Sequence, residues 1–204
     1  ENRPNEKLVC VDIVNSQPVF MSIATTEIID RFTPELHEAK AIVAKFQNHE
    51  SVIRFKNVCA DGTIYESIME YFNDNGITID RKQAKPVAYS GFFGNYLWFE
   101  VGKLKKEFKI LAYKFLQTQY NGVYQMFKEM KQDRWSANSG KIYANNCMLA
   151  QRLESQIFYT IIVPAVWEAG YRDFSTIHDS LILPESDAKN VRSIMMNEFR
   201  KLNI

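Results

Sequence analysis

The chain is poor in the residues that build disulfide scaffolds, metal clusters and flexible loops. Its 204 residues include 3 Cys, 3 His, 6 Pro and 8 Gly. Cys10, Cys59 and Cys147 are far apart, and such an unpatterned set argues against a disulfide framework or a zinc site and favours a reducing compartment. The histidines are equally scattered and lack metal-ligand spacing. We therefore expect neither a disulfide-stapled domain nor a histidine-based metalloenzyme.

Several sequence signatures are also missing. No Gly-rich phosphate loop and no Gly-x-Ser-x-Gly nucleophile turn occurs. No apolar run approaches membrane-spanning length, and no signal peptide is visible, so we expect a cytoplasmic protein that does not contact a membrane. Lys and Arg number 25 against 24 Asp and Glu, a net charge of +1, so bulk electrostatics gives no support for nucleic-acid binding.

What the chain does contain is apolar and aromatic. Hydrophobic residues make up 46% of it and aromatic residues 13%, enough for a substantial core. The apolar pattern predicts few strands and many helices, an α+β fold. We expect a buried strand over 8–14 and a hairpin over 173–183. Helices are expected through Phe20 and Ile23, from Thr33 with Pro34 in the first turn, from Thr63 to about 75, from an Asp80 cap, over 103–118, 121–131 and 145–169, and from a Ser186-Asp187 cap to about Lys201.

The stretch from Arg81 to Gly94 has a four-residue spacing of cations and aromatics. In a helix, Arg81, Lys85, Tyr89 and Phe93 would follow one another along one flank. Two cations followed by two aromatic rings suit a ligand with a polyphosphate at one end and a base and sugar at the other. The alternative is an ordinary amphipathic helix with a cationic rim.

Two carboxylates lie at the ends of strand-like segments on either side of this stretch. Asp12 comes where the apolar run that starts at Leu8 stops, and the pair His178-Asp179 separates two β-rich arms. The alternative roles are a helix cap for Asp12 and a turn residue for Asp179.

In this order, the three segments resemble motifs A, B and C of family A DNA polymerases, which are related to single-subunit phage-type RNA polymerases. The resemblance implies a small antiparallel palm sheet with inserted and flanking helices that form the fingers. We accordingly expect palm at 1–60, fingers at 61–135 and palm again at 136–204. It also implies that a thumb region or accessory proteins complete the enzyme, and because the sequence starts at Glu1, close to Asp12, we expect it to be part of a longer protein.

The resemblance implies nucleotidyl transfer to a primer. That chemistry needs two divalent cations bridged by carboxylates, and hard oxygen ligands favour Mg²⁺, for which Mn²⁺ can substitute. The expected metal ligands are Asp12, Asp179 and the backbone carbonyl of Ile13. Lys85 is expected to protonate the pyrophosphate leaving group, a role that comes from the resemblance alone.

The remaining site residues follow from the same resemblance. Arg81 and Lys85 would hold the phosphates of a dNTP, and Tyr89 and Phe93 its base and sugar. Aligned without gaps, Gln17 lies where DNA-making relatives have a sugar-selecting Glu, whereas alignment on Ser16-Gln17 needs two inserted residues. For the primer-template the corresponding residues are His178 and Gln151.

Two departures from the family pattern affect these expectations. Pro86 removes a helix donor directly after Lys85 and should either kink the helix or force it to begin there. Evidence on the sugar is divided, since Phe93 is DNA-like whereas Ser180 is typical of RNA polymerases. The leading hypothesis is a template-directed, primer-extending polymerase core; the alternatives are a polymerase-derived nucleic-acid-binding module without activity, and an unrelated helical protein.

Overall fold

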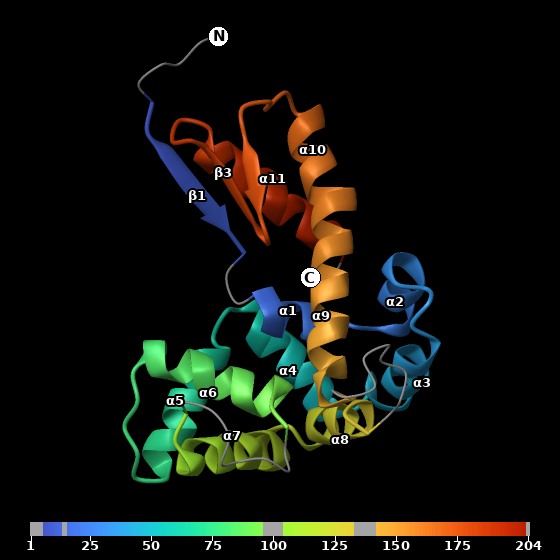
Figure 1. Ribbon diagram of the computed structural model, residues 1–204, viewed down its shortest axis with the longest axis vertical. Coiled ribbons are helices and arrows are strands. Elements are labelled where there is room, and N and C mark those ends of the chain that lie inside the picture. The colour runs from blue at the N-terminus through green and yellow to red at the C-terminus, as the bar shows by residue number, and fades with distance from the viewer. Residues whose placement is uncertain (1–5, 14–15, 96–103, 133–141, 203–204) are drawn as a thin grey trace. The chain divides into compact units, whose positions relative to one another are not determined.

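The chain is described by a computed structural model that covers residues 6–13, 16–95, 104–132 and 142–202 (Figure 1). It divides into two units. Unit 1 consists of Glu1–Ser16 with Arg152–Ile204, and unit 2 consists of Gln17–Gln151. Unit 1 contains the three strands, and unit 2 is helical, so the expected α+β class with a small antiparallel sheet is confirmed.

The sheet of unit 1 joins the two ends of the sequence. Strands β1 (Leu8–Asp12), β3 (Ser180–Pro184) and β2 (Ser175–Ile177) lie in the order β1-β3-β2, and both pairings are antiparallel. The predicted strand and hairpin are thus both present, although the strand ends at Asp12 rather than at residue 14. β3 pairs with β2 in the hairpin and with β1 on its other edge, so it is the central strand.

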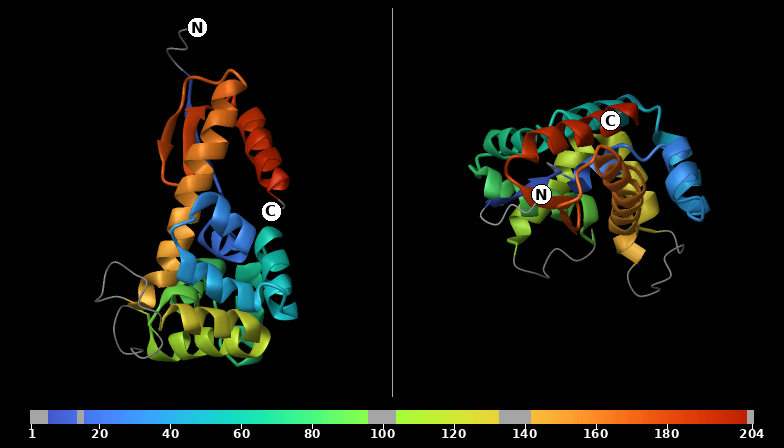
Figure 2. Two further views of the ribbon diagram at one scale, coloured as in Figure 1. Left: turned by 90° about the vertical axis from the view of Figure 1, so that its right-hand side faces the viewer. Right: turned by 90° about the horizontal axis from the view of Figure 1, so that it is seen from above.

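The two faces of this sheet differ. Val11 is opposite Leu181 and both are buried, as α11 (Ala188–Lys201) packs against the sheet through its apolar side. Residues on the other face, including Leu8 and Asp12, are exposed. Because side chains alternate along a strand, Asp12 projects from the face opposite to α11. The helices of unit 1 lie on one side of the strands, as the left view of Figure 2 shows.

The expected helix over 145–169 is present with one local change. α9 (Asn145–Ile157) continues through a π-helical turn (Phe158–Ile162) into α10 (Val163–Glu168). Pro164 has no N–H to donate to the carbonyl of Thr160, so the regular α-helical ladder is interrupted at this point. The run ends at Gly170, whose φ of +95° suits glycine.

Unit 2 consists of helices around an aromatic core. Phe55 lies at its centre, with its ring centroid 5.5 Å from that of Phe92, 5.4 Å from Tyr120 and 6.3 Å from Phe127. These edge-to-face contacts join three helices and bury large apolar surfaces. The helices are α1 (Ser16–Ser22), α2 (Thr26–Phe32), α3 (His37–Phe46), α4 (Glu50–Ala60), α5 (Ile64–Asp74), α6 (Arg81–Phe93), α7 (Lys106–Gln119) and α8 (Asn121–Met130).

Helix positions in the first part of unit 2 differ from expectation. α2 and α4 were not expected, and the helix expected from Thr33 begins at His37 instead. The side chain of Thr33 donates backwards to the carbonyl of Ile29, at the end of α2, so it does not cap α3. Thr63 likewise donates to the carbonyl of Val58 rather than capping α5. α5 nevertheless begins directly after Thr63, as expected, whereas the start expected at Thr33 is wrong, because Ser and Thr hydroxyls can bond in either direction.

The unit boundaries do not coincide with the expected palm and fingers boundaries at 60/61 and 135/136. Residues 17–60 belong to the helical unit because their side chains pair with its later helices. Ser51 accepts a hydrogen bond of 2.8 Å from the amide of Gly122, and Lys45 forms a 2.7 Å ion pair with Glu129. Among the described residues, no helix combines the length and apolar character that crossing a membrane requires.

Candidate functional site

The sheet of unit 1 brings the two predicted catalytic carboxylates to the same end. In the β1–β3 register, Asp12 is paired with Ser180, the residue that follows Asp179. Although 167 positions separate the two aspartates in the sequence (179 − 12), they flank one strand pair. Main-chain hydrogen bonds hold the strands in this register. The burial of Val11 selects it, because a slip by one residue would turn Val11 to the open face.

The pair His178-Asp179 forms the two-residue loop of the β2–β3 hairpin. Ile177 pairs with Ser180 across the loop, and the hydroxyl of Ser180 donates to the carbonyl of Ile177 at 2.8 Å. His178 has a φ of +52°, the one positive value among the described non-glycine residues. Left-handed backbone is uncommon outside glycine and is often found where a loop presents functional side chains. His178 is exposed and Asp179 is half-buried.

The ligands predicted at this end of the sheet are oxygen atoms of the kind that Mg²⁺ prefers. They are the carboxylates of Asp12 and Asp179 and the main-chain carbonyl of Ile13, which directly follows β1. The donor set fits a hard divalent cation, and it lacks the sulfur and imidazole ligands of zinc sites. In the ranges 6–13, 16–95, 104–132 and 142–202, no cluster of three or more His, Cys, Asp and Glu side chains is arranged to hold a metal. The predicted site uses two side chains and a carbonyl, so it is not of that type.

In unit 2, the helix α6 begins where Asp80 predicts. The Asp80 carboxylate accepts from the amide of Gln83 at 2.7 Å, and the Gln83 side chain accepts from the amide of Asp80 at 3.0 Å. This reciprocal pair satisfies two amides at the start of the helix and fixes the position of Arg81. The helix continues through Pro86 to Phe93, so of the two expected outcomes, a kink or a start at the proline, the start is wrong.

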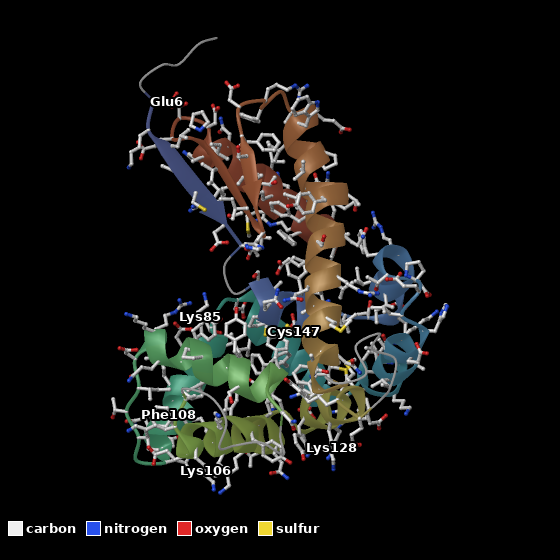
Figure 3. The ribbon with its side chains drawn as sticks, in the orientation of Figure 1. Glu6, Lys85, Lys106, Phe108, Lys128 and Cys147 are labelled. Carbon is white, nitrogen blue, oxygen red and sulfur yellow. The ribbon has the colours of Figure 1, made fainter. Side chains whose placement is uncertain are left out.

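The predicted flank of α6 is its accessible side. Arg81 and Lys85 are exposed, whereas Tyr89 and Phe93 are half-buried with ring centroids 5.7 Å apart. The opposite side, which includes Val87 and Phe92, is buried. Figure 3 labels Lys85 on this helix. Two cations about one helical turn apart, followed by a pair of half-buried rings, therefore lie on the accessible side of α6.

Arg81 has partners within unit 2. Its Nε donates to the Glu66 carboxylate at 2.7 Å, and its guanidinium lies 5.2 Å from the ring centroid of Tyr65. Burial raises the pKa of Tyr65 to about 12, and the nearby Tyr89 adds to the rise while Arg81 opposes it. For Glu66, burial acts to raise the pKa, but hydrogen bonds from Arg81 and the backbone, with the charge of Arg81, lower it overall. A phosphate that binds Arg81 would have to compete with Glu66.

The C-terminal end of α6 is held by buried polar side chains. Lys131 donates to the carbonyl of Gly94 at 2.8 Å and to that of Gly91 at 3.5 Å, and Asn146 donates to the carbonyl of Phe92 at 3.0 Å. These bonds satisfy carbonyls that have no partner within the helix. Burial lowers the pKa of Lys131 well below its usual value of 10.5.

The glycine that ends the expected motif has a steric role. A Cβ atom at Gly94 would lie 2.3 Å from the carbonyl oxygen of Ser90, closer than any real contact. The residue after Phe93 is thus restricted to glycine in this backbone conformation. The motif pattern includes Gly94 but does not indicate its partner Lys131, or Asn146, because no pattern near these two residues shows which carbonyls they reach.

The other site residues lie on two helices. Gln17 is in α1, next to the boundary of unit 2, and its side chain is half-buried. Gln151 is in α9 and is exposed. Both belong to unit 2, together with the α6 residues, whereas Asp12, Ile13, His178 and Asp179 belong to unit 1.

Comparison with known proteins adds no relative to this picture. No protein-family model matches the chain, and no curated protein and no solved structure matches it either. Its functional interpretation therefore rests on the residues and the geometry described above.

Proposed function

We propose that this chain is a template-directed nucleotidyltransferase core that extends a nucleic-acid primer with dNTPs, as a DNA-directed DNA polymerase does. The observation that carries the proposal is the β1–β3 register, which places Asp12 and Asp179 at one end of one sheet. A coincidental pair of Asp-containing segments would have no reason to meet in this way. The accessible flank of α6 gives independent support. Its two exposed cations offer partners for a triphosphate, and its two half-buried rings offer partners for a base.

The carboxylates of unit 1 have a defined role in this proposal. Asp12, Asp179 and the Ile13 carbonyl would hold two Mg²⁺ ions, which lower the pKa of the primer 3′-hydroxyl and stabilise charge that develops on the transferred phosphoryl group. Asp179 lies in the two-residue loop of the hairpin, and the adjacent His178 would contact the primer end. Because Asp12 is exposed on the open face of the sheet, it is accessible to a substrate on that side.

The flank of α6 would bind the incoming nucleotide. Arg81 has the planar guanidinium that suits paired phosphate oxygens, but it must first leave Glu66. Lys85 is exposed and forms no ion pair with any carboxylate in the described residues, so it is available for a phosphate or as a proton donor to pyrophosphate. Tyr89 and Phe93 would stack on the base and sugar, Gln17 would contact the sugar, and Gln151 the primer-template.

The test is primer extension by the full chain with Mg²⁺ or Mn²⁺ and a labelled primer-template. Asp12→Asn and Asp179→Asn remove ligands worth several kcal/mol in the transition state, so each should reduce incorporation by about 10³-fold or more. Asp173→Asn is the matched control, since Asp173 is an exposed aspartate of the same unit outside the sheet. Circular dichroism should show that all three variants stay folded.

The result also decides between catalysis and simple binding. Near-normal extension by either Asp12→Asn or Asp179→Asn would refute the two-metal assignment. If the wild-type chain binds primer-template yet releases no pyrophosphate with either metal, the alternative of a polymerase-derived binding module replaces the proposal. The broken pattern at Pro86 motivates that alternative, although α6 remains helical there.

A further inference from the structure

A groove follows the solvent-facing side of α11 in unit 1. It encloses about 730 Å³ and lies outside the candidate site at the Asp12 end of the sheet. Its lining contains three cations interleaved with neutral side chains, and one carboxylate. The residues that form it are Glu185, Ala188, Lys189, Arg192, Ser193, Met196, Asn197 and Arg200.

Helix geometry arranges these cations in a row. Residues 189, 192 and 200 recur near one side of the helix, and with a rise of 1.5 Å per residue the row is about 16 Å long. All three side chains are exposed. Arg200 donates to the Asn197 side chain at 3.0 Å, a bond that restrains its guanidinium within the groove.

Carboxylates do not neutralise the row. Glu185 also lines the groove, but its carboxylate forms a 3.1 Å ion pair with Lys7. Lys189 and Arg192 have no ion-pair partner in the described part of the chain, whereas Lys201, on another side of the same helix, pairs with Glu198 at 2.6 Å. The groove therefore has a local positive charge that the net charge of +1 conceals.

In the folded protein, α11 cannot insert into a bilayer, because its apolar side is buried against the rest of unit 1. Val191, Met195 and Phe199 are all at least 92% buried, so they are not available to enter lipid. A membrane-surface helix needs that side exposed, together with its basic side. What the groove presents is a line of cations with hydrogen-bonding neighbours, which matches a row of phosphates.

We propose that this α11 groove binds the sugar-phosphate backbone of a nucleic acid, at a surface separate from the candidate active site. Contacts to phosphates from Lys189, Arg192 and Arg200 make the binding independent of base sequence and strongly dependent on salt. The inference does not rest on the proposed nucleotidyl transfer, because binding here needs neither Asp12 nor Asp179 nor a metal.

The test is fluorescence anisotropy with a labelled single-stranded 20-mer in EDTA, at several NaCl concentrations between 50 and 200 mM. Lys189→Gln and Arg192→Gln should each reduce the salt slope by about 0.7, which corresponds to roughly fivefold weaker binding at 0.1 M salt. Lys201→Gln, on the same helix but outside the groove, should bind within about twofold of wild type. Since every substituted side chain is exposed, thermal unfolding should be nearly unchanged in all three variants.

Three outcomes would overturn the proposal. The first is that Lys189→Gln and Arg192→Gln bind the 20-mer with the affinity of wild type. The second is that Lys201→Gln loses as much affinity as they do, which would indicate a general charge effect. The third uses competitors: if polyglutamate or anionic vesicles displace the 20-mer at lower charge concentration than unlabelled DNA does, the groove serves an acidic protein or a lipid surface instead. Primer extension by the groove variants tests the other proposal separately, since Asp12 and Asp179 are intact in them.

Discussion

The two units place their candidate site residues by different physical means. In unit 1, Asp12 and Asp179 are positioned by main-chain hydrogen bonds of a three-stranded sheet. In unit 2, the position of α6 depends on side chains, namely the aromatic core around Phe55 and the buried donor Lys131. Backbone pairing tolerates many side-chain changes, whereas a packed core and buried hydrogen bonds do not.

This difference has a functional consequence. A catalytic carboxylate must keep its position relative to a second carboxylate. The fixed pairing register of β1 and β3 maintains that position. A nucleotide-binding helix must instead exchange partners, as Arg81 must exchange Glu66 for a phosphate. We therefore expect perturbations of unit 2 to alter substrate binding and stability, and perturbations at the sheet end to affect chemistry alone.

The largest expected effect on stability is that of Phe55→Ala. Phe55 is 1% exposed and contacts three aromatic rings, so its truncation should cost about 3–5 kcal/mol of the free energy of unfolding. Urea denaturation followed by circular dichroism measures this loss. Ile53→Ala, half-exposed on the same helix, is the control and should cost less than about 1 kcal/mol.

Hydrogen exchange on the same variant sharpens the comparison. If the units differ as described, Phe55→Ala should accelerate exchange of the amides of α4, α6 and α8 more than that of β1 and β3. Equal acceleration in the strands would show that the two units unfold as one, and the distinction between them would fail.

An intermediate effect is expected for Lys131→Met, which keeps the aliphatic packing but removes the donor to Gly94. In the variant, the unsatisfied buried carbonyl of Gly94 should cost about 1–3 kcal/mol of the free energy of unfolding at neutral pH. Part of this loss is offset because the variant no longer buries an amine that can carry a charge. Because burial lowers the pKa of Lys131 in the folded state, the unfolded chain binds more protons between that value and about 10.5. Wild-type stability relative to the variant should therefore rise with pH across this window, by up to about 1.4 kcal/mol per unit.

Urea denaturation of both proteins from pH 7 to 10 measures this dependence. Wild-type and variant curves that remain parallel over the whole range would contradict the lowered pKa. Lys128→Met, in the last turn of α8 just before Lys131 but exposed, serves as the matched control and should show no such divergence.

The smallest effect is predicted for Asp80→Ala, at the other end of α6. Loss of the capping hydrogen bond to Gln83 should cost about 1 kcal/mol. Asp74→Ala, at the C-terminal end of α5, removes an exposed aspartate without a cap and should be neutral or slightly stabilising. If the two variants are equally stable, the capping box does not fix the start of α6.

Much of the fold was predictable wherever a local signal was strong. The Asp80 start of α6, the hairpin around His178-Asp179, the split between α7 and α8 and the long helix up to Gly170 are all confirmed. Each depends on residues within one or two turns of the boundary. An ambiguous local signal failed at Thr33, because a hydroxyl bonds equally well to a carbonyl behind it; Thr63 did mark the start of α5, although its hydroxyl also bonds backwards.

By itself, the sequence determined the three strands and most of the helices, though not α2 or α4, as well as which flank of α6 is accessible and that each aspartate ends or turns a strand. These properties depend on nearest neighbours and on the period of apolar residues. Only the tertiary structure decided that β1 pairs with β3, that Glu66 holds Arg81, and that Lys131 and Asn146 secure the end of α6. Those partners are between 15 positions (81 − 66, Arg81 and Glu66) and 176 positions (184 − 8, Leu8 and Pro184) apart in the sequence. No local pattern encodes such pairs, because packing of the whole core selects them from many chemically equivalent donors and acceptors.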